Sequence, residues 1–270
     1  MREANAVKLV TSAANPAIKL VRALDDKKHR RETGLYVAEG LRTALTAAEQ
    51  NVWPETLIFS SELKQHPKLR DYLARCLARG IDCIEASNQA MEKIARRDNP
   101  QGVVGIYRAG WSRLEDFSLT PQSCLIALQM IRDPGNLGTI MRTADAVGAA
   151  GIVLIDECCD PFSIEAVRAS MGSIFAVKLA KARFADFNAW RQPLGGMLVG
   201  TSLRASEDYR KLDYRGPVFL MMGNEQAGLP REYEDACDAR VRIPMRGTAD
   251  SLNVAVATAI VLYEINRATL

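Results

Sequence analysis

Apolar residues before residue 110 follow two alternating patterns. Short continuous runs, which are typical of buried strands, cover residues 35–38, 56–60, 82–85 and 103–108. Apolar residues spaced by three or four positions, which predict amphipathic helices, cover residues 16–31, 41–50, 68–79 and 88–96. This alternation predicts one compact α/β domain at residues 1–108.

The same alternation resumes after residue 123. Strands are predicted at residues 124–129, 152–155, 176–179, 197–200, 218–222 and 240–243. Helices are predicted at residues 137–147, 164–171, 184–191 and 252–267. Such a series predicts a mostly parallel sheet with helices on both faces, in which ligands bind beyond the carboxyl ends of the strands. We therefore expect a second α/β domain at residues 123–270.

The stretch between the two domains, residues 109–122, contains Gly110 and Pro121 and few apolar residues in series. This composition predicts a linker. A chain of 270 residues is long enough for two domains that each bury a core.

Histidine and cysteine usage excludes several classes of site. The presence of only two histidines, His29 and His66, argues against a Ser-His-Asp triad, a His-x-x-x-His zinc site and a multi-His metal cage. The six cysteines form no Cys-x-x-Cys pair, so we expect reduced thiols, no metal and a cytoplasmic protein. The pair Cys158 and Cys159 has two interpretations, a redox pair and two small residues after a strand. The longest apolar stretch, residues 146–155, is too short to span a membrane.

Charge is unevenly distributed along the chain. Residues 1–110 contain 18 Lys and Arg against 13 Asp and Glu, whereas residues 111–270 contain 17 against 19. The densest basic cluster is predicted at the end of the first helix and consists of Lys27, Lys28, Arg30 and Arg31 around His29. Cations at a helix end complement its dipole, which explains one or two of these residues. The second interpretation is a surface that binds the phosphates of a nucleic acid.

Glycine-rich phosphate loops are absent from the sequence. None of the 18 glycines is followed by another glycine two positions later, and no Gly-Lys-Ser/Thr is present. A nucleotide-like cofactor would therefore need another binding geometry.

Polar segments follow three of the predicted strands instead. The first begins at Asn136, which is placed to cap a helix that carries Arg142 on its polar face. The second contains Gly223, which allows close approach of the backbone to a ligand, and Glu225 in a loop. Both segments are predicted at the carboxyl edge of the sheet.

The third segment, residues 243–253, leads into a final helix that is apolar on nearly every face. Such a helix is buried in a core or in a subunit interface. Its first turn carries Ser251 and Asn253, whose polar groups need partners there. We expect this segment to converge with the other two.

The three segments, NLGTIMRTADAVGA, MGNEQAGLP and IPMRGTADSLNVAVATAI, resemble the three motifs of the SpoU (TrmH) family of RNA 2′-O-ribose methyltransferases, within the knotted SPOUT superfamily. VRASMGSIF at residues 167–175 is also similar to the family, and the resemblance covers residues 124–268. Upstream, SAANPAIKLVRAL and LYVAEGLRTALTAAE resemble the ribosomal-protein-like substrate-binding domain of members that act on ribosomal RNA.

The resemblance implies a trefoil knot, a pocket for S-adenosyl-L-methionine (AdoMet) formed by the knot loops, and a homodimer whose interface shapes the active site. By position in the motifs, the residues expected to contact AdoMet are Gly223, Ile243 and Leu252, with Thr201 and Met245 as further wall positions. The residues at the catalytic positions are Asn136, Arg142, Glu225, Ser251 and Asn253. The basic cluster at Lys27, Lys28, Arg30 and Arg31 is the candidate RNA-binding surface.

Methyl transfer to a ribose hydroxyl needs no metal, but the weakly acidic 2′-OH must be aligned and its developing alkoxide stabilised. Guanidinium groups stay protonated in proteins, which favours electrostatic stabilisation by Arg142 over a role as general base, although both remain open. Large-subunit ribosomal RNA is the expected substrate, with tRNA as the alternative. A non-catalytic RNA-binding protein of ribosome assembly is a further alternative. A small-molecule methyltransferase would leave the basic first domain without a purpose.

Overall fold

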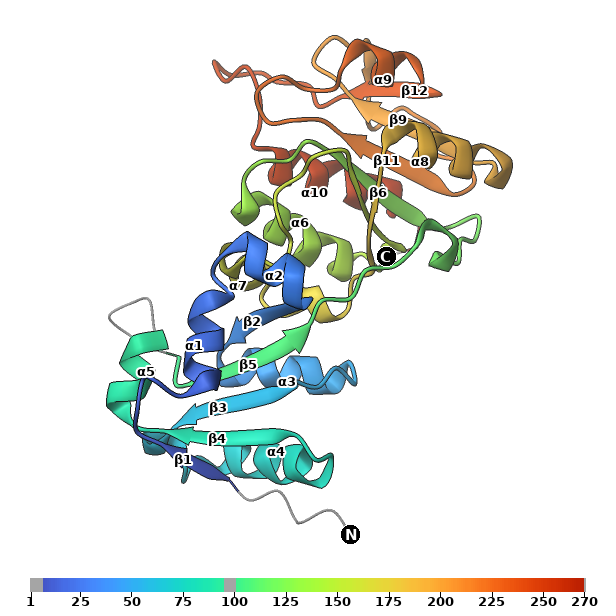
Figure 1. Cartoon of the computed structure of the whole chain (residues 1–270). Coiled ribbons are helices and arrows are strands. Elements are labelled where there is room, and N and C mark those ends of the chain that lie inside the picture. The colour runs from blue at the N-terminus through green and yellow to red at the C-terminus, as the bar shows by residue number, and fades with distance from the viewer. Residues whose placement is uncertain (1–6, 95–100, 270) are drawn as a thin grey trace. The chain divides into compact units, whose positions relative to one another are not determined.

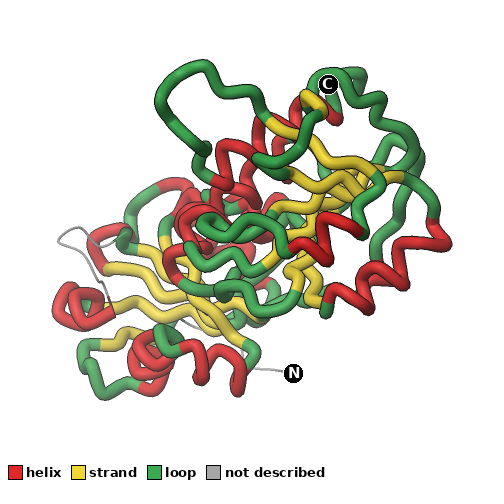
Figure 2. Tube along the Cα trace, turned by 90° about the horizontal axis from the view of Figure 1, so that it is seen from above, coloured by secondary structure: helices red, strands yellow, loops and turns green. Residues whose placement is uncertain are grey.

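The computed structural model describes residues 7–94 and 101–269 and divides into two compact units. The first comprises Met1–Ala109 together with Phe162–Phe175, and the second comprises Gly110–Pro161 and Ala176–Leu270. Each unit consists of helices around a central sheet (Figures 1 and 2). Within the described residues, no helix combines the length and apolar character needed to cross a bilayer.

The first unit contains a five-stranded mixed sheet in the order β1-β4-β3-β5-β2. Its strands are β1 (Lys8–Val10), β2 (Leu35–Glu39), β3 (Thr56–Ser60), β4 (Asp82–Ala86) and β5 (Val103–Arg108). Its helices include α3 (Leu41–Glu49), α4 (Pro67–Ala78) and α5 (Asn88–Ile94). The three strands β1, β4 and β3 are parallel, whereas β5 is antiparallel to both of its neighbours. Four predicted strands are confirmed, and the three-residue edge strand β1 was not predicted because so short a run shows no pattern.

The predicted helix over residues 16–31 is wrong, because this stretch forms two helices, α1 (Pro16–Ala23) and α2 (Lys27–Thr33). Asp26 begins the second helix: its carboxylate accepts hydrogen bonds from the backbone amides of Lys28 and His29, at 2.6 and 3.3 Å. The helix ends at Gly34, which adopts a left-handed conformation. The basic cluster therefore spans a short helix of its own, and the dipole of that helix does not favour the cations in its first turn.

The segment Phe162–Phe175 belongs to the first unit, although the sequence predicted a continuous second domain. Its helix α7 (Ile164–Ser170) packs against β2, and the guanidinium of Arg168 contacts the carboxylate of Glu39 with an Nε–Oε2 distance of 3.2 Å. The rings of Tyr36 and Phe162 lie 4.9 Å apart between centroids. These contacts join positions more than 100 residues apart, so the local sequence pattern carried no sign of them.

The second unit contains a seven-stranded sheet, in which every pair is parallel, in the order β10-β12-β9-β11-β6-β7-β8. Its strands are β6 (Cys124–Gln129), β7 (Gly151–Ile155), β8 (Leu179–Ala182), β9 (Met197–Thr201), β10 (Glu207–Asp208), β11 (Val218–Met222) and β12 (Ala239–Arg242). Its helices are α6 (Pro134–Ala146), α8 (Phe184–Arg191), α9 (Arg231–Asp235) and α10 (Val254–Ile265). This architecture confirms the predicted α/β class with a mostly parallel sheet.

Two strands of this sheet differ from prediction by more than one residue at either end. Strand β8 begins three residues later than expected, because pairing with β7 aligns Leu179 with Ile152. The two-residue strand β10 was not predicted. In addition, the expected linker packs partly onto the second unit: the side chain of Phe117 is buried in its core, and the backbone of Ser112 donates to the carbonyl of Leu179 at 2.8 Å.

The strand order brings three loops to the same edge of the second sheet. Strands β6 and β11 are neighbours, and β12 lies one strand further along, beyond β9. Helix α6 follows β6, and α10 follows the loop after β12; these two helices pack against each other. Because parallel strands point the same way, all three loops leave the sheet at its carboxyl edge.

Candidate active site

A carboxylate in the loop after β11 connects two of the converging loops. The carboxylate of Glu225 accepts from the backbone amides of Arg132 and Asp133, each at 3.4 Å. It also accepts from the side-chain amide of Asn136, with an Nδ2–Oε1 distance of 3.2 Å. Glu225 therefore holds the loop after β11 against the start of α6.

The amide side chain of Asn136 is free for this contact because another residue caps α6. The prediction that Asn136 is the N-cap is wrong: Asp133 is the cap, and its Oδ1 accepts from the backbone amide of Asn136 at 2.7 Å. Asn136 lies inside the first turn and points its side chain out of the helix towards Glu225.

The third loop joins the cluster through Asn253. This residue caps α10, because its Oδ1 accepts from the backbone amides of Ala255 and Val256 at 2.9 and 3.3 Å. Its Nδ2 donates to Oδ1 of Asn136 at 2.8 Å. The chain Asn253–Asn136–Glu225 thus crosses three loops, and every amide group in it has a defined orientation.

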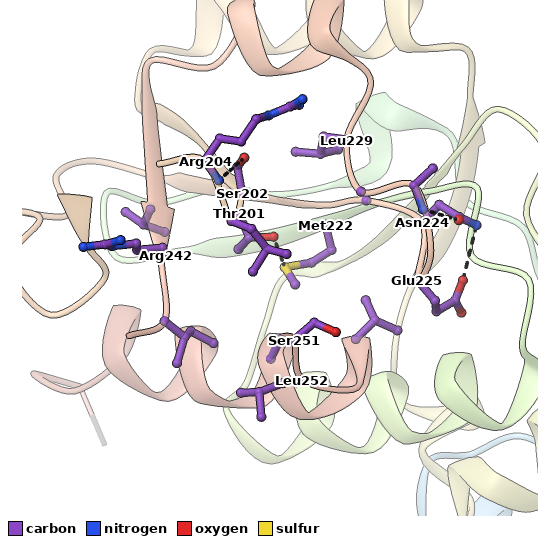
Figure 3. A pocket seen from close by; sticks show the side chains of 18 of the residues that line it. Thr201, Ser202, Arg204, Met222, Asn224, Glu225, Leu229, Arg242, Ser251 and Leu252 are labelled. Carbon is purple, nitrogen blue, oxygen red and sulfur yellow. Dashed lines mark hydrogen bonds between the residues drawn. The ribbon is translucent and has the colours of Figure 1, made fainter. Parts of the chain in front are cut away.

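Beside this cluster lies a cavity of about 350 Å³, here called the strand-end cavity. Its lining includes all five residues expected to contact a cofactor: Thr201, Gly223, Ile243, Met245 and Leu252. Glu225 and Ser251 also line it, whereas Asn136 and Asn253 do not line it and are linked to Glu225 by hydrogen bonds. Figure 3 shows Ser251 and Leu252 on the side of the cavity formed by the start of α10, with Thr201 and Met222 above them.

The backbone at Gly223 has a strict steric requirement. A Cβ atom at this position would lie 2.3 Å from the backbone carbon of Gly228 and 2.3 Å from the backbone nitrogen of Leu229. The residue is therefore needed for the loop to fold back on itself, as the bridge between Asn224 and Gly228 shows. This is a different reason from the expected approach of the backbone to a ligand.

An ion pair that the sequence did not indicate forms another part of the wall. Nη2 of Arg204 lies 2.9 Å from Oε2 of Glu234, whose side chain is 7% exposed, and both residues line the strand-end cavity. Burial opposes ionisation of Glu234, but hydrogen bonds from Ser202 and Arg204 outweigh it and lower the pKa of the carboxyl. The partners are 30 residues apart and belong to no motif, so no local signal could identify them.

Comparison with known proteins identifies the family. Residues 123–263 match the model of the SpoU rRNA Methylase family, and residues 15–105 match the MRM3-like substrate binding domain. The chain belongs to the SpoU rRNA methylase family.

Similar SpoU proteins cover nearly the whole chain. The chain is 27% identical to the 23S rRNA (guanosine(2553)-2′-O)-methyltransferase RlmP of Bacillus subtilis, over 96% of this chain and 99% of that protein. It is 30% identical to the 23S rRNA (uridine(2479)-2′-O)-methyltransferase of Streptomyces viridochromogenes, over 90% and 86%. An AdoMet-bound rRNA methyltransferase from Sinorhizobium meliloti superposes with a TM-score of 0.91 at 47% identity, over 98% and 99%.

One SpoU motif residue is separated from the cluster and from the cavity. Arg142 lies on the exposed side of α6 and does not line the strand-end cavity, and its side chain forms no hydrogen bond or ion pair with any residue in the described ranges. The structure of one chain therefore assembles four of the five expected catalytic residues and leaves Arg142 on the surface.

The basic cluster of the first unit contains one structural residue. Arg30 is 8% exposed, and its Nη1 donates to the backbone carbonyls of Leu24 and Asp25 at 2.8 and 2.6 Å. It joins α1 to α2 and is not available to an RNA phosphate, which corrects its assignment to the RNA-binding surface. Lys27, Lys28 and Arg31 are exposed.

The cysteines and potential metal ligands form no further site in the part of the chain that the structure describes. No three His, Cys, Asp or Glu side chains come together there as metal ligands. All six cysteines are free thiols. Burial raises the pKa of Cys159 to about 12, and burial also raises the pKa of Cys158, so neither thiol is activated as a thiolate.

Proposed function

We propose that this SpoU protein transfers a methyl group from AdoMet to the 2′-hydroxyl of a ribose in large-subunit ribosomal RNA. The observation that carries the proposal is the cluster of Asn253, Asn136 and Glu225 at the edge of the strand-end cavity. The names of the relatives support the substrate, because those proteins act on 23S ribosomal RNA at the ribose oxygen. We infer that the protein works in the cytoplasm, where free thiols persist.

The strand-end cavity fits AdoMet by its chemistry. Apolar side chains of Met222, Ile243 and Leu252 line it and suit an adenine ring, and the Arg204–Glu234 pair supplies both charges for a zwitterionic amino-acid group. When bound, AdoMet supplies an electrophilic methyl group on its sulfonium. The Sinorhizobium meliloti neighbour was solved with AdoMet bound, which supports this assignment. The trefoil knot stays a prediction.

The residues of the chain would then act on the ribose. Glu225 and Asn136 hold each other in place and orient the ribose hydroxyl, while Ser251 presents its hydroxyl to the cavity. Arg142 stabilises the negative charge that develops on the 2′-oxygen, because a guanidinium remains charged and offers several donors. A base role for Arg142 would require it to lose a proton that guanidinium groups retain.

We further propose that a homodimer completes this site. Arg142 lies outside the cavity of its own chain, and the exposed face of α10 is apolar: Val256 is 47% exposed and Tyr263, two turns later, is 52% exposed. Residues seven positions apart share one face of a helix, so the two side chains form a stripe that a second copy would bury. The homodimer implied by the SpoU motifs supplies that copy.

The substrate is tested with labelled AdoMet and separate pools of unmodified ribosomal RNA and tRNA, followed by mapping of alkali-resistant 2′-O-methyl nucleotides. We expect one methylated position in large-subunit RNA and none with the Arg142→Ala variant. Methylation confined to tRNA would show that the substrate is tRNA and not ribosomal RNA. AdoMet binding without methylation of either pool would favour the non-catalytic alternative.

The dimer is tested by co-expressing two defective chains, one with Arg142→Ala and the other with Gly223→Val. If Arg142 acts on the cavity of the partner, mixed dimers contain one intact site and regain activity. If Arg142 acts within its own chain, mixed dimers stay inactive. Sedimentation of Tyr263→Glu checks whether the stripe on α10 holds the copies together.

A further inference from the structure

A second hollow of the same unit lies beside the strand-end cavity and has no role in the chemistry described above. It has a volume of about 680 Å³ and lies between residues 206–211 and residues 242–246. Arg242 and Ile243 line both hollows, so the two share one wall. We call it the basic hollow, for the four cations in its lining: Arg210, Lys211, Arg242 and Arg246.

Beyond the two shared residues, the segment lines each hollow with different side chains. Met245 lines only the strand-end cavity, whereas Pro244 and Arg246 line only the basic hollow. Alternate residues of an extended segment point to opposite sides, which fits the separation of Met245 from its two neighbours. Figure 3 shows the guanidinium of Arg242 directed away from the centre of the strand-end cavity.

The lining of the basic hollow contains more cations than carboxylates. Arg210 is paired with Asp208, with an Nε–Oδ1 distance of 3.0 Å, and this contact lowers the pKa of Asp208 to about 2. Lys211, Arg242 and Arg246 are exposed and form no ion pair with a residue that the structure describes. Glu207 is the other acidic residue of the lining. The hollow therefore carries an excess of positive charge.

We propose that the basic hollow binds the phosphodiester backbone of the RNA substrate, outside the nucleotide that is methylated. The inference rests on the proposed function. Exposed guanidinium and ammonium groups without carboxylate partners favour phosphate, and phosphate contacts set the position of a nucleic acid without reading its sequence.

The position of the hollow determines which kinetic constant it affects. Glu225 and Arg242 lie on opposite sides of the strand-end cavity (Figure 3). A phosphate in the basic hollow is therefore separated from the reacting ribose by the cofactor site. The hollow contributes to RNA affinity and leaves the chemical step unchanged.

The test is the double variant Lys211→Gln/Arg246→Gln, which leaves the shared residue Arg242 in place. We expect KM for RNA to rise about tenfold at physiological salt, with kcat and AdoMet affinity unchanged. The slope of log binding constant against log salt should become shallower by about two, one for each lost phosphate contact. Filter binding over a salt series and single-turnover methylation measure these quantities.

The matched control is Arg215→Gln/Arg231→Gln. It removes the same charge from exposed positions of the same unit, but these arginines are paired with Asp213 and Asp235 and do not line the hollow. An equal loss of slope in the control would overturn the proposal, because general charge would then explain the effect. An unchanged slope in the test variant would overturn it as well.

Competition with inorganic phosphate distinguishes an RNA backbone from a free anion. One outcome would be that the wild-type protein binds inorganic phosphate at millimolar concentration while the double variant binds RNA with wild-type affinity. The hollow would then be a small-anion site, and the proposal would be wrong. Failure of the proposed function has another signature: wild-type protein would bind RNA with the full salt slope but incorporate no methyl group.

Discussion

Both units place polar side chains at the carboxyl ends of parallel strands, but they use them differently. In the first unit, Asn88 donates to Glu62 at 2.5 Å and lies 3.4 Å from the hydroxyl of Ser60, so the groups satisfy one another beside β3 and β4. In the second unit, Glu225 and Asn136 connect separate loops, and Glu225 also faces the strand-end cavity. The second group of polar residues is therefore the candidate site, because part of its hydrogen-bonding capacity faces a cavity.

The basic residues differ in a similar way. Arg30 of the first unit is buried and uses its guanidinium to hold backbone carbonyls, whereas Arg142 of the second unit is exposed and unpaired. The two arginines are indistinguishable by residue type, and their surroundings decide which one supports the fold and which one is available to a substrate.

The largest expected effect is that of Arg142→Ala. We expect methylation to be abolished, because the developing alkoxide loses its stabilising charge, while AdoMet binding measured by calorimetry stays within about twofold of wild type. If the variant methylated the RNA substrate at a rate close to that of wild type, this result would contradict the assigned role.

The comparison of strand ends is tested directly by two equivalent substitutions. Glu225→Gln should lower kcat by about two orders of magnitude, because the neutral amide no longer accepts from two backbone amides and Asn136 at once. Glu62→Gln in the first unit should leave kcat unchanged. Equal losses in both variants would show that the effect reflects stability and not the site.

A smaller effect is expected from the backbone at the cavity. Gly223→Ala forces a Cβ atom into the backbone of Gly228, which should lower the free energy of unfolding by about 1–3 kcal/mol and weaken AdoMet binding. Gly247→Ala is the matched control, because an added Cβ there meets no atom within 4 Å. Denaturant titration of both variants gives the difference between their free energies of unfolding. The absence of a difference would show that the loop relaxes around the added Cβ atom and would contradict the prediction.

The smallest expected effect concerns the basic cluster of the first unit. Replacing Lys27, Lys28 and Arg31 by Gln should weaken RNA binding several-fold and flatten its salt dependence, without a change in stability. Arg30→Gln should instead lower the free energy of unfolding by about 1–3 kcal/mol, because one buried and one partly buried backbone carbonyl lose their donor. A loss of stability in the triple variant, or no loss in Arg30→Gln, would contradict the distinction between the three exposed cations and the structural Arg30.

Much of the fold followed from the sequence alone. The strands Thr56–Ser60, Val103–Arg108, Cys124–Gln129 and Val218–Met222 and the helix Phe184–Arg191 have the predicted boundaries. These are long apolar runs or clear helical patterns, and such patterns are local. The three motif segments likewise indicated the family that the comparisons show.

Other features depended on contacts between distant residues. The sequence contained the capping signal of Asp26, but the break between α1 and α2 was not predicted. Neither the partnership of Arg204 with Glu234, nor the packing of Phe162–Phe175 on β2, nor the exchange of capping roles between Asp133 and Asn136 has a local signature.

The sequence by itself predicted most of the elements, the family and the polar residues of the three motif segments. The tertiary structure decided which of these residues meet, because the order of strands in a parallel sheet sets which loops are neighbours. Residues 136, 225 and 253 become partners only when β6 and β11 pair and α10 packs against α6. Burial, which depends on the whole fold, then separated the structural arginine from those that remain exposed.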